Sequence, residues 1–281
     1  VKRIVLWFVK SLSNNKSHKY KNQDIIMSNK HFLALPVTGD TFAEIREKNR
    51  YYVDKTPYLK TVFSEDEAVD DKSLINGTTV LLLTRPRRFG KTLLMNMFES
   101  FLKISANEPG NITKHLNYFK GTKILEDKEF CKKYMGQFPV ISITLKDVLG
   151  DDFESAYLKL AEVVSAKANE FSFLKESPYL NEMEKAKFNL LCDEIYLKKA
   201  DKQAISYVTS AIKSLSLMLY KHFNKQVYIL IDEYDVPLAK AQDNNYHKEM
   251  VELMSSFLDF LKDTQKDPEK DTSIISKVIL T

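Results

Sequence analysis

Residues 80–92 read Val-Leu-Leu-Leu-Thr-Arg-Pro-Arg-Arg-Phe-Gly-Lys-Thr, an apolar stretch followed by a basic loop. A helical pattern begins at Thr92, and a strand before Gly-Lys-Thr with a helix after it is the setting of a phosphate-binding loop. Backbone N–H groups and the positive end of such a helix can hold a polyphosphate. Lys91 can neutralise the β and γ phosphates, and the Thr92 hydroxyl can ligate Mg²⁺.

The loop departs from the pattern G-x-x-x-x-G-K-[ST] at its first glycine, where Arg85 stands. Pro86 can set a turn there, and three arginines add positive potential. Arg88 lies nearest the phosphate end of the loop, and Phe89 is expected to pack beneath the loop rather than to stack on a base. The alternative is a helix N-terminus that is basic by chance. The candidate phosphate-binding residues are Arg85, Pro86, Arg87, Arg88, Phe89, Gly90, Lys91 and Thr92.

A second motif follows the apolar stretch at 227–231, which ends in Asp232-Glu233-Tyr234-Asp235. Ligands of open parallel sheets bind at the carboxyl ends of the strands, so both motifs point to one crevice. Asp232 can hold the Mg²⁺, directly or through water, and Glu233 can polarise a water for in-line attack on the γ-phosphate. The alternative is a pair of solvated turn residues.

Strand-like and helical stretches alternate along the chain. Apolar runs rich in β-branched residues occur at 79–84, 140–145, 227–231 and 278–281, and helical patterns at 92–104, 153–171, 204–223 and 246–262. This alternation predicts an α/β fold with a mostly parallel sheet, the three-layer sandwich of P-loop NTPases. The two motifs indicate the additional-strand, catalytic-glutamate branch, in which the next strand inserts between the two motif strands. Thr281, at the end of that strand, is then the candidate sensor of the γ-phosphate.

Composition restricts the class of protein. The chain has 281 residues, of which 44% are hydrophobic, enough for a sizeable core. Its seven glycines are too far apart for a GxGxxG dinucleotide fingerprint. Two cysteines make no disulfide scaffold and fit a reducing cytoplasm. No apolar run reaches the ~18 residues of a membrane span.

The positive charge gathers at the N-terminus. Residues 1–30 hold seven Lys or Arg against one Asp, a charge of +6, so that residues 31–281 carry −2 of the formal +4. The main body therefore has no strong footprint for nucleic acid. We expect residues 1–30 to be a basic, poorly ordered extension, with contact to an anionic membrane surface as an alternative. Residues 31–76 are expected to form a lead segment, and residues 77–281 the P-loop core.

These motifs resemble one family, the AAA-ATPase-like proteins of bacteria, in which a PD-(D/E)XK nuclease-like region commonly follows the ATPase domain. The resemblance covers roughly residues 33–281 and is carried by 51–56 (Tyr-Tyr-Val-Asp-Lys-Thr), 84–92, 118–121, 138–147 and 231–238 (Ile-Asp-Glu-Tyr-Asp-Val-Pro-Leu). It implies that Arg85 is the family's own variant. It also implies that Asp54, Lys55 and Thr56 lie near the nucleotide, and a structural packing motif is the alternative for these three.

The motifs and the resemblance together indicate an ATP-binding, Mg²⁺-dependent hydrolase that couples hydrolysis to a conformational change. Its candidate catalytic residues are Lys91, Glu233 and Thr281, and its candidate metal ligands are Thr92 and Asp232. One alternative is a nucleotide-controlled binding or regulatory module with little or no turnover, and another is a degenerate loop that binds no nucleotide. A homo-oligomer or a protein partner is compatible with these alternatives, whereas nucleic acid would be bound through a C-terminal module that is absent here.

The order of the motifs predicts an ATPase core that is truncated after its sensor strand. A helical lid with a second sensor arginine would follow Thr281 in such a core. We therefore expect this chain alone to hydrolyse ATP slowly or not at all.

Overall fold

A parallel sheet is the centre of the fold. The structure, a computed structural model, describes residues 5–7, 33–63, 80–84, 86, 89–262, 266–267 and 272–281, and of residues 5–7 it describes the backbone. Within these residues five strands pair in parallel in the order β1-β2-β5-β4-β3. The strands are β1 (Val5–Trp7), β2 (Val80–Leu83), β3 (Val140–Thr144), β4 (Val227–Asp232) and β5 (Ile275–Leu280).

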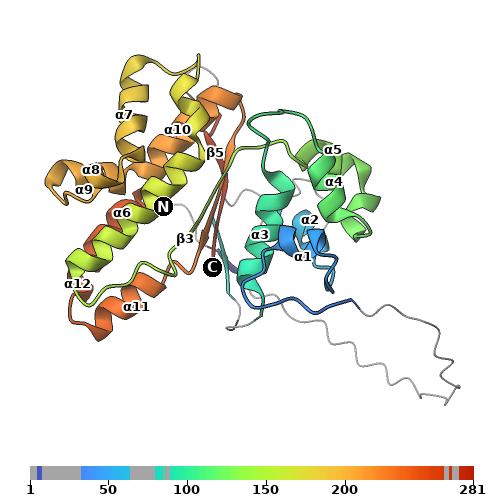
Figure 1. The fold of residues 1–281 in the computed structure, drawn as a ribbon, viewed down its shortest axis with the longest axis horizontal. Coiled ribbons are helices and arrows are strands. Elements are labelled where there is room, and N and C mark those ends of the chain that lie inside the picture. The colour runs from blue at the N-terminus through green and yellow to red at the C-terminus, as the bar shows by residue number, and fades with distance from the viewer. Residues whose placement is uncertain are drawn as a thin grey trace, which may run out of the picture.

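Helices cover both faces of this sheet (Figure 1). One face carries α1 (Phe42–Glu47), α2 (Pro57–Phe63), α3 (Lys91–Leu102), α4 (Thr113–Phe119), the 3₁₀ helix η1 (Lys123–Glu126) and α5 (Lys128–Tyr134). The other face carries α6 (Phe153–Glu170), η2 (Ser172–Glu176), α7 (Glu182–Cys192), α8 (Glu194–Leu197), α9 (Lys202–Thr209), α10 (Ala211–Phe223), α11 (Val236–Asp243), α12 (His247–Phe257) and η3 (Asp259–Leu261). The described residues thus form the three-layer α/β sandwich that the alternation predicts.

Each face of the sheet buries its own core. Along β4, Ile229 and Ile231 belong to the core under α6–α12, whereas Tyr228 and Leu230 belong to the core under α1–α5. Successive side chains of a strand point to opposite faces. The strand sequences are apolar throughout, rather than alternating, because both faces are covered.

The strands of the sheet confirm the prediction from the apolar runs. Four of them coincide with the predicted strands, although β5 begins at Ile275, three residues before its predicted start. β5 lies between β2 and β4, as the motif order predicts. The remaining strand, β1, lies within the N-terminal extension and pairs with β2 on the side away from β5.

The prediction of one helix over 204–223 is wrong, because the chain breaks at Ser210 between α9 and α10. There the Thr209 hydroxyl donates to the Ile205 carbonyl at 2.9 Å, and the Ser210 hydroxyl donates to the Ser206 carbonyl at 2.7 Å. Such side-chain bonds compete with the helical ladder and favour a bend. The predicted helix over 246–262 is also shorter, because α12 ends at Phe257 and a 3₁₀ turn follows.

The lead segment packs directly on the helix that follows the phosphate loop. Helix α1 begins with a capping box in which the Thr41 hydroxyl and the Glu44 carboxylate bond each other's backbone N–H groups. Its fully buried Phe42 ring lies 4.9 Å from the Phe119 ring and 5.2 Å from the Tyr52 ring. These rings share one core with α3, so the lead segment is packed against that helix.

Candidate functional site

The carboxyl ends of β5 and β4 bring two of the predicted site residues together. Leu82 of β2 pairs with Leu280 of β5, which pairs with Ile231 of β4. The residues just beyond, Thr281 and Asp232, are therefore neighbours at the same edge. The chain leaves β2 at this edge toward α3, so the two sequence motifs follow strands on either side of the inserted strand β5.

The loop delivers Lys91 and Thr92 to the start of α3. Gly90 is the N-cap residue of this helix, and the first helical bond runs from the Leu94 N–H to the Gly90 carbonyl at 3.0 Å. The N–H groups of the first turn therefore have no acceptor within the helix, and no side chain among the described residues caps them. This end of α3 therefore has N–H donors without acceptors in the helix and the positive end of the helix dipole, two features that favour an anion.

The loop itself differs from the prediction at Phe89. We expected this ring to pack beneath the loop, but 59% of its surface is exposed, so that prediction is wrong. The Phe89 N–H bonds the carbonyl of Pro86 at 3.4 Å, which turns the chain just before Gly90 and leaves the ring outside the core. Pro86 is also exposed, whereas Arg85, Arg87 and Arg88 lie outside the described residues.

Gly90 has a backbone conformation that other residues adopt only with strain. Its φ is +74°, and a Cβ atom there would lie 2.8 Å from the Lys55 Nζ. Gly121 has nearly the same φ, +75°, but a Cβ atom there would meet nothing within 4 Å. Substitution of either glycine therefore strains the backbone, but only substitution of Gly90 also crowds the Lys55 side chain.

We expect Gly90→Ala and Gly121→Ala each to lower the free energy of unfolding by about 1 kcal/mol, because both force alanine into the left-handed region. Gly90→Ala alone should also weaken ATP binding, because the methyl group displaces the Lys55 ammonium beside the loop. Urea denaturation and ATP titration of both variants measure the two effects. Wild-type ATP affinity in Gly90→Ala would contradict this prediction.

Asp232 and Thr281 are joined by a direct hydrogen bond. The Thr281 hydroxyl donates to Oδ1 of Asp232, and both side chains are buried. The backbone supports this contact, because the Thr281 N–H bonds the Ile231 carbonyl at 3.0 Å and the Tyr234 N–H bonds the Thr281 carbonyl at 3.3 Å. The predicted metal ligand and the predicted sensor thus lie in contact at the end of neighbouring strands.

Glu233 follows Asp232 in a strained conformation. Its φ is +57°, in the left-handed region that non-glycine residues seldom occupy. The turn lets the chain leave β4 and enter α11, with the Val236 N–H bonded to the Glu233 carbonyl at 3.2 Å. Side chains held in such conformations cluster at functional sites, where the surrounding structure maintains the strain.

Residues 54–56 of the lead segment make two kinds of contact: Asp54 and Thr56 bond η1, and Lys55 bonds the loop before α3. Asp54 accepts hydrogen bonds from the Thr56 N–H at 2.9 Å and from the Lys123 N–H at 2.9 Å, so it holds the lead segment to η1. Thr56 is fully buried and accepts the Ile124 N–H at 3.2 Å. Lys55 points the other way, and its ammonium group donates to the Phe89 carbonyl at 3.4 Å. Asp54 and Thr56 are thus structural, whereas Lys55 reaches the phosphate loop, a position that spacing alone did not predict.

The Asp54 carboxylate is stabilised in its charged form. Burial works to raise its pKa, but the hydrogen bonds from the backbone of Lys123 and from Thr56 outweigh burial and hold the pKa below 3.8. Because the folded-state pKa is lowered, this stabilisation is present above the unfolded pKa and is lost as the pH falls through the folded value.

We expect Asp54→Asn to lower the free energy of unfolding by about 1–3 kcal/mol at pH 7, because an amide group would face the Lys123 N–H. The difference from the wild type should narrow as the pH falls from 3.8, the ordinary pKa, through the lower pKa of the folded state, where the wild-type carboxylate becomes protonated too. Urea denaturation between pH 3 and pH 7 checks both statements. Asp147→Asn, at an exposed aspartate, is the control, and a destabilisation that does not change with pH would contradict the prediction.

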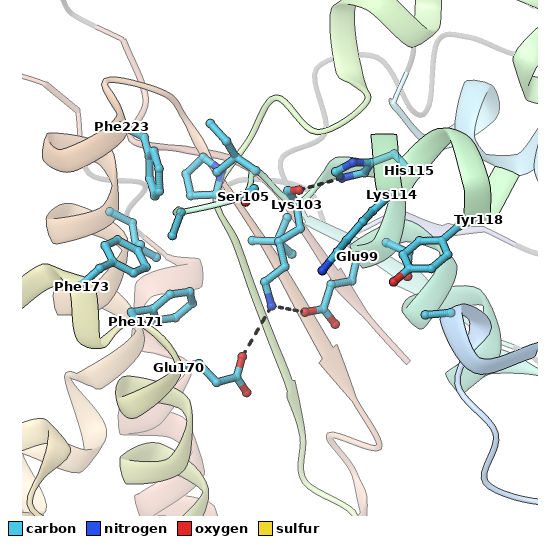
Figure 2. Close-up of a pocket in the computed structure, with 17 residues that line it drawn as sticks. Glu99, Lys103, Ser105, Lys114, His115, Tyr118, Glu170, Phe171, Phe173 and Phe223 are labelled. Atoms are coloured by element: carbon cyan, nitrogen blue, oxygen red, sulfur yellow. Dashed lines mark hydrogen bonds and ion pairs between the residues drawn. The ribbon is translucent and has the colours of Figure 1, made fainter. Parts of the chain in front are cut away.

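A cavity of about 380 Å³ lies at the opposite edge of the sheet, beside the start of β3 (Figure 2). The Lys103 ammonium pairs with Glu99 at 2.8 Å and with Glu170 at 3.6 Å, which joins α3 to α6. Burial opposes the charge of Lys103, but the two carboxylates outweigh burial and raise its pKa above 10.5. Phenylalanine rings form the facing wall, namely Phe171, Phe173 and Phe223. None of the predicted site residues lines this cavity.

The residues present at the carboxyl edge fit a magnesium nucleotide. Oxygen ligands suit Mg²⁺, and this edge offers the Asp232 carboxylate and the exposed Thr92 hydroxyl. The Thr84 hydroxyl, at the end of β2, is buried and has no hydrogen-bond partner among the described residues.

Within the described part of the chain, no group of three or more His, Cys, Asp or Glu side chains is placed to form an all-protein metal site. Nor does that part contain a helix long and apolar enough to cross a bilayer.

Comparison with known proteins gives a family. The model of a family described as "Predicted AAA-ATPase" (AAA-ATPase-like) matches residues 36–281. An uncharacterised protein in the vnfD 5′ region of Azotobacter chroococcum mcd 1 is 29% identical over 132 residues. These residues are 47% of this chain and 20% of that protein, so the match spans about a fifth of the relative's length. No solved structure matches this chain.

Proposed function

Because this chain belongs to the predicted AAA-ATPase family, we propose that it binds ATP with Mg²⁺ at the carboxyl edge of β2, β5 and β4 and hydrolyses it to drive a conformational change. One observation carries the proposal. The inserted strand β5 brings Thr281 into contact with Asp232 at the edge where the loop enters α3. This arrangement supports the additional-strand, catalytic-glutamate branch of P-loop NTPases.

The triphosphate binds at the start of α3. The N–H groups of its first turn and the Lys91 ammonium hold the phosphate oxygens, and Arg88 contacts either phosphate or a neighbouring subunit. Thr92 and Asp232 hold the Mg²⁺, which neutralises charge on the β and γ phosphates when it is bound. The hydrogen bond from Thr281 orients the Asp232 carboxylate for this task.

Glu233 is the general base for hydrolysis. Its carboxylate accepts a proton from a water that attacks the γ-phosphorus, while the bond from that phosphorus to the β–γ bridging oxygen breaks. The products are ADP and inorganic phosphate. Thr281 senses the γ-phosphate, because its hydroxyl reaches Asp232 from the strand between the two motif strands.

ATP binding and phosphate release, measured on the same wild-type sample, test the proposal. Binding in the micromolar range together with Mg²⁺-dependent phosphate release supports a hydrolase. Binding without release supports the alternative, a nucleotide-controlled module. The absence of ATP binding contradicts both.

A further inference from the structure

The cavity of about 380 Å³ beside the start of β3 has no part in the proposed function (Figure 2). Its volume falls in the range of roughly 300–1,000 Å³ that is typical of small-molecule sites. Two stretches that line it, 103–106 and 139–140, are held together by backbone bonds. The Ile104 N–H bonds the Phe138 carbonyl at 2.8 Å, and the Phe138 N–H bonds the Leu102 carbonyl at 3.0 Å. The cavity is therefore built into the junction between α3 and β3.

One wall of the cavity is aromatic. Phe171 follows α6, Phe173 lies in η2 and Phe223 ends α10, and Figure 2 shows the three side chains together on one side of the cavity. The Phe173 ring lies 6.2 Å from the Phe171 ring and 5.6 Å from the Phe223 ring, in edge-on contacts that fix the three rings relative to one another. This wall suits an apolar or aromatic group of a ligand.

Charged side chains form the facing wall, and most of their charges are matched. Lys103 lies between Glu99 and Glu170, and Glu170 also pairs with Lys167 at 2.6 Å. Burial works to raise the pKa of Glu99, but the Lys103 ammonium outweighs burial and holds the pKa below 4.5. The two carboxylates therefore stay charged beside two ammonium groups, and these four charges cancel.

Lys114 adds a positive charge that these residues do not match. Figure 2 shows its side chain pointing from α4 into the cavity. Among the described residues, no carboxylate forms an ion pair with its ammonium group. Ser105 also lines the cavity, and its hydroxyl oxygen accepts the Glu108 N–H at 3.3 Å, so its O–H can donate to a ligand. The cavity thus combines one unmatched positive charge and an O–H donor with an apolar wall.

We infer that this cavity binds a small organic acid, whose carboxylate pairs with Lys114 and whose apolar body packs against the three phenylalanine rings. A cation would be repelled by Lys114, and an uncharged ligand would leave its charge unmatched. The inference is independent of ATP binding, because the cavity lies at the amino end of β3, whereas the proposed phosphate site lies at the carboxyl edge of the sheet.

Ligand-observed NMR titration of the full chain tests the inference with three probes that share one skeleton: 3-phenylpropanoate, 3-phenylpropan-1-ol and 3-phenylpropylamine. We expect the acid to bind with a dissociation constant of about 1 mM or lower. It should bind about fivefold more tightly than the alcohol, the upper end for one exposed charge pair, and the amine should bind most weakly.

Three variants separate the charge from the apolar wall. Lys114→Gln should lower the affinity for the acid to that for the alcohol and leave the alcohol unchanged. Ala106→Trp places an indole ring in the cavity and should abolish the binding of both. Lys132→Gln, at an exposed lysine of α5 that does not line the cavity, is the matched control and should change neither affinity. Thermal melting of each variant checks that it is folded.

Four results would overturn the inference. One is the absence of acid binding to the wild type at several millimolar, and another is acid binding that Ala106→Trp leaves intact. A third is equal affinity for the acid and the alcohol in the wild type, which is also expected if the cavity receives an apolar side chain of a protein partner. The fourth is displacement of the acid by inorganic tripolyphosphate with Mg²⁺, which would place the acid at the start of α3. None of these results bears on whether the chain binds ATP.

Discussion

Lys91→Ala is expected to lower the affinity for ATP roughly 10- to 100-fold. Lys91 is the first residue of α3, beside the N–H groups of the first turn, which have no acceptor within the helix. A hydrogen bond between charged groups contributes about 1.5–3 kcal/mol, and each 1.4 kcal/mol corresponds to a factor of about ten in affinity. The loss should be similar for ATP and for tripolyphosphate, because Lys91 contacts the phosphates in this account. Isothermal titration of the wild type and the variant measures it.

Lys202→Ala is the matched control for Lys91→Ala. Lys202 is likewise the first residue of a helix, α9, and it is exposed, but α9 lies on the other face of the sheet. Its removal should leave ATP affinity unchanged. Equal affinities for the wild type, Lys91→Ala and Lys202→Ala would show that the start of α3 does not bind the phosphates.

Glu233→Gln is expected to lower the rate of phosphate release at least 100-fold and to leave ATP binding intact. The amide has the shape of the carboxylate but accepts no proton from the attacking water, and a general base contributes roughly 10²- to 10⁴-fold. The rate is measured as a single turnover, with protein in excess over radiolabelled ATP, so that product release does not limit it. The same titrations as for Lys91 report the affinity.

Glu249→Gln provides the control for the loss of one carboxylate. Glu249 is exposed in the first turn of α12 and should change neither rate nor affinity. Equal, negligible phosphate release by the wild type and Glu233→Gln, with ATP bound by both, would contradict the hydrolase. That result would favour the nucleotide-controlled module.

The strands of the sheet can be predicted from the sequence, because a strand that is buried on both faces consists of a short, continuous apolar run. The runs that became β2, β3 and β4 are short, apolar and rich in branched residues, and a helical pattern follows each of them. The position of β5 between the two motif strands followed from the motif order. Its first residues, Ile275 to Lys277, were missed because Ser276 and Lys277 interrupt the apolar run, although β5 continues through them.

The ends of the helices and the positions of the loop side chains depend on hydrogen bonds that the pattern of apolar residues does not reveal. At the break, the Ser210 hydroxyl bonds a carbonyl of the preceding turn. The spacing of the apolar residues continues across Ser210 without interruption, so it did not reveal the break. Phe89 was expected to pack beneath the loop, yet its ring is exposed, and its N–H bonds the Pro86 carbonyl in a turn just before Gly90. The resemblance pointed to residues 54–56 together, but the structure separates Lys55 from its neighbours.

A crystal structure of this chain with Mg²⁺ and a non-hydrolysable ATP analogue tests whether ATP binds at the carboxyl edge of β2, β5 and β4. We expect triphosphate density at the start of α3, within hydrogen-bond distance of the Lys91 and Thr92 N–H groups. We also expect Mg²⁺ near Asp232. An analogue bound elsewhere, for example in the cavity beside Lys103, or no bound analogue at saturating concentration, would contradict the claim.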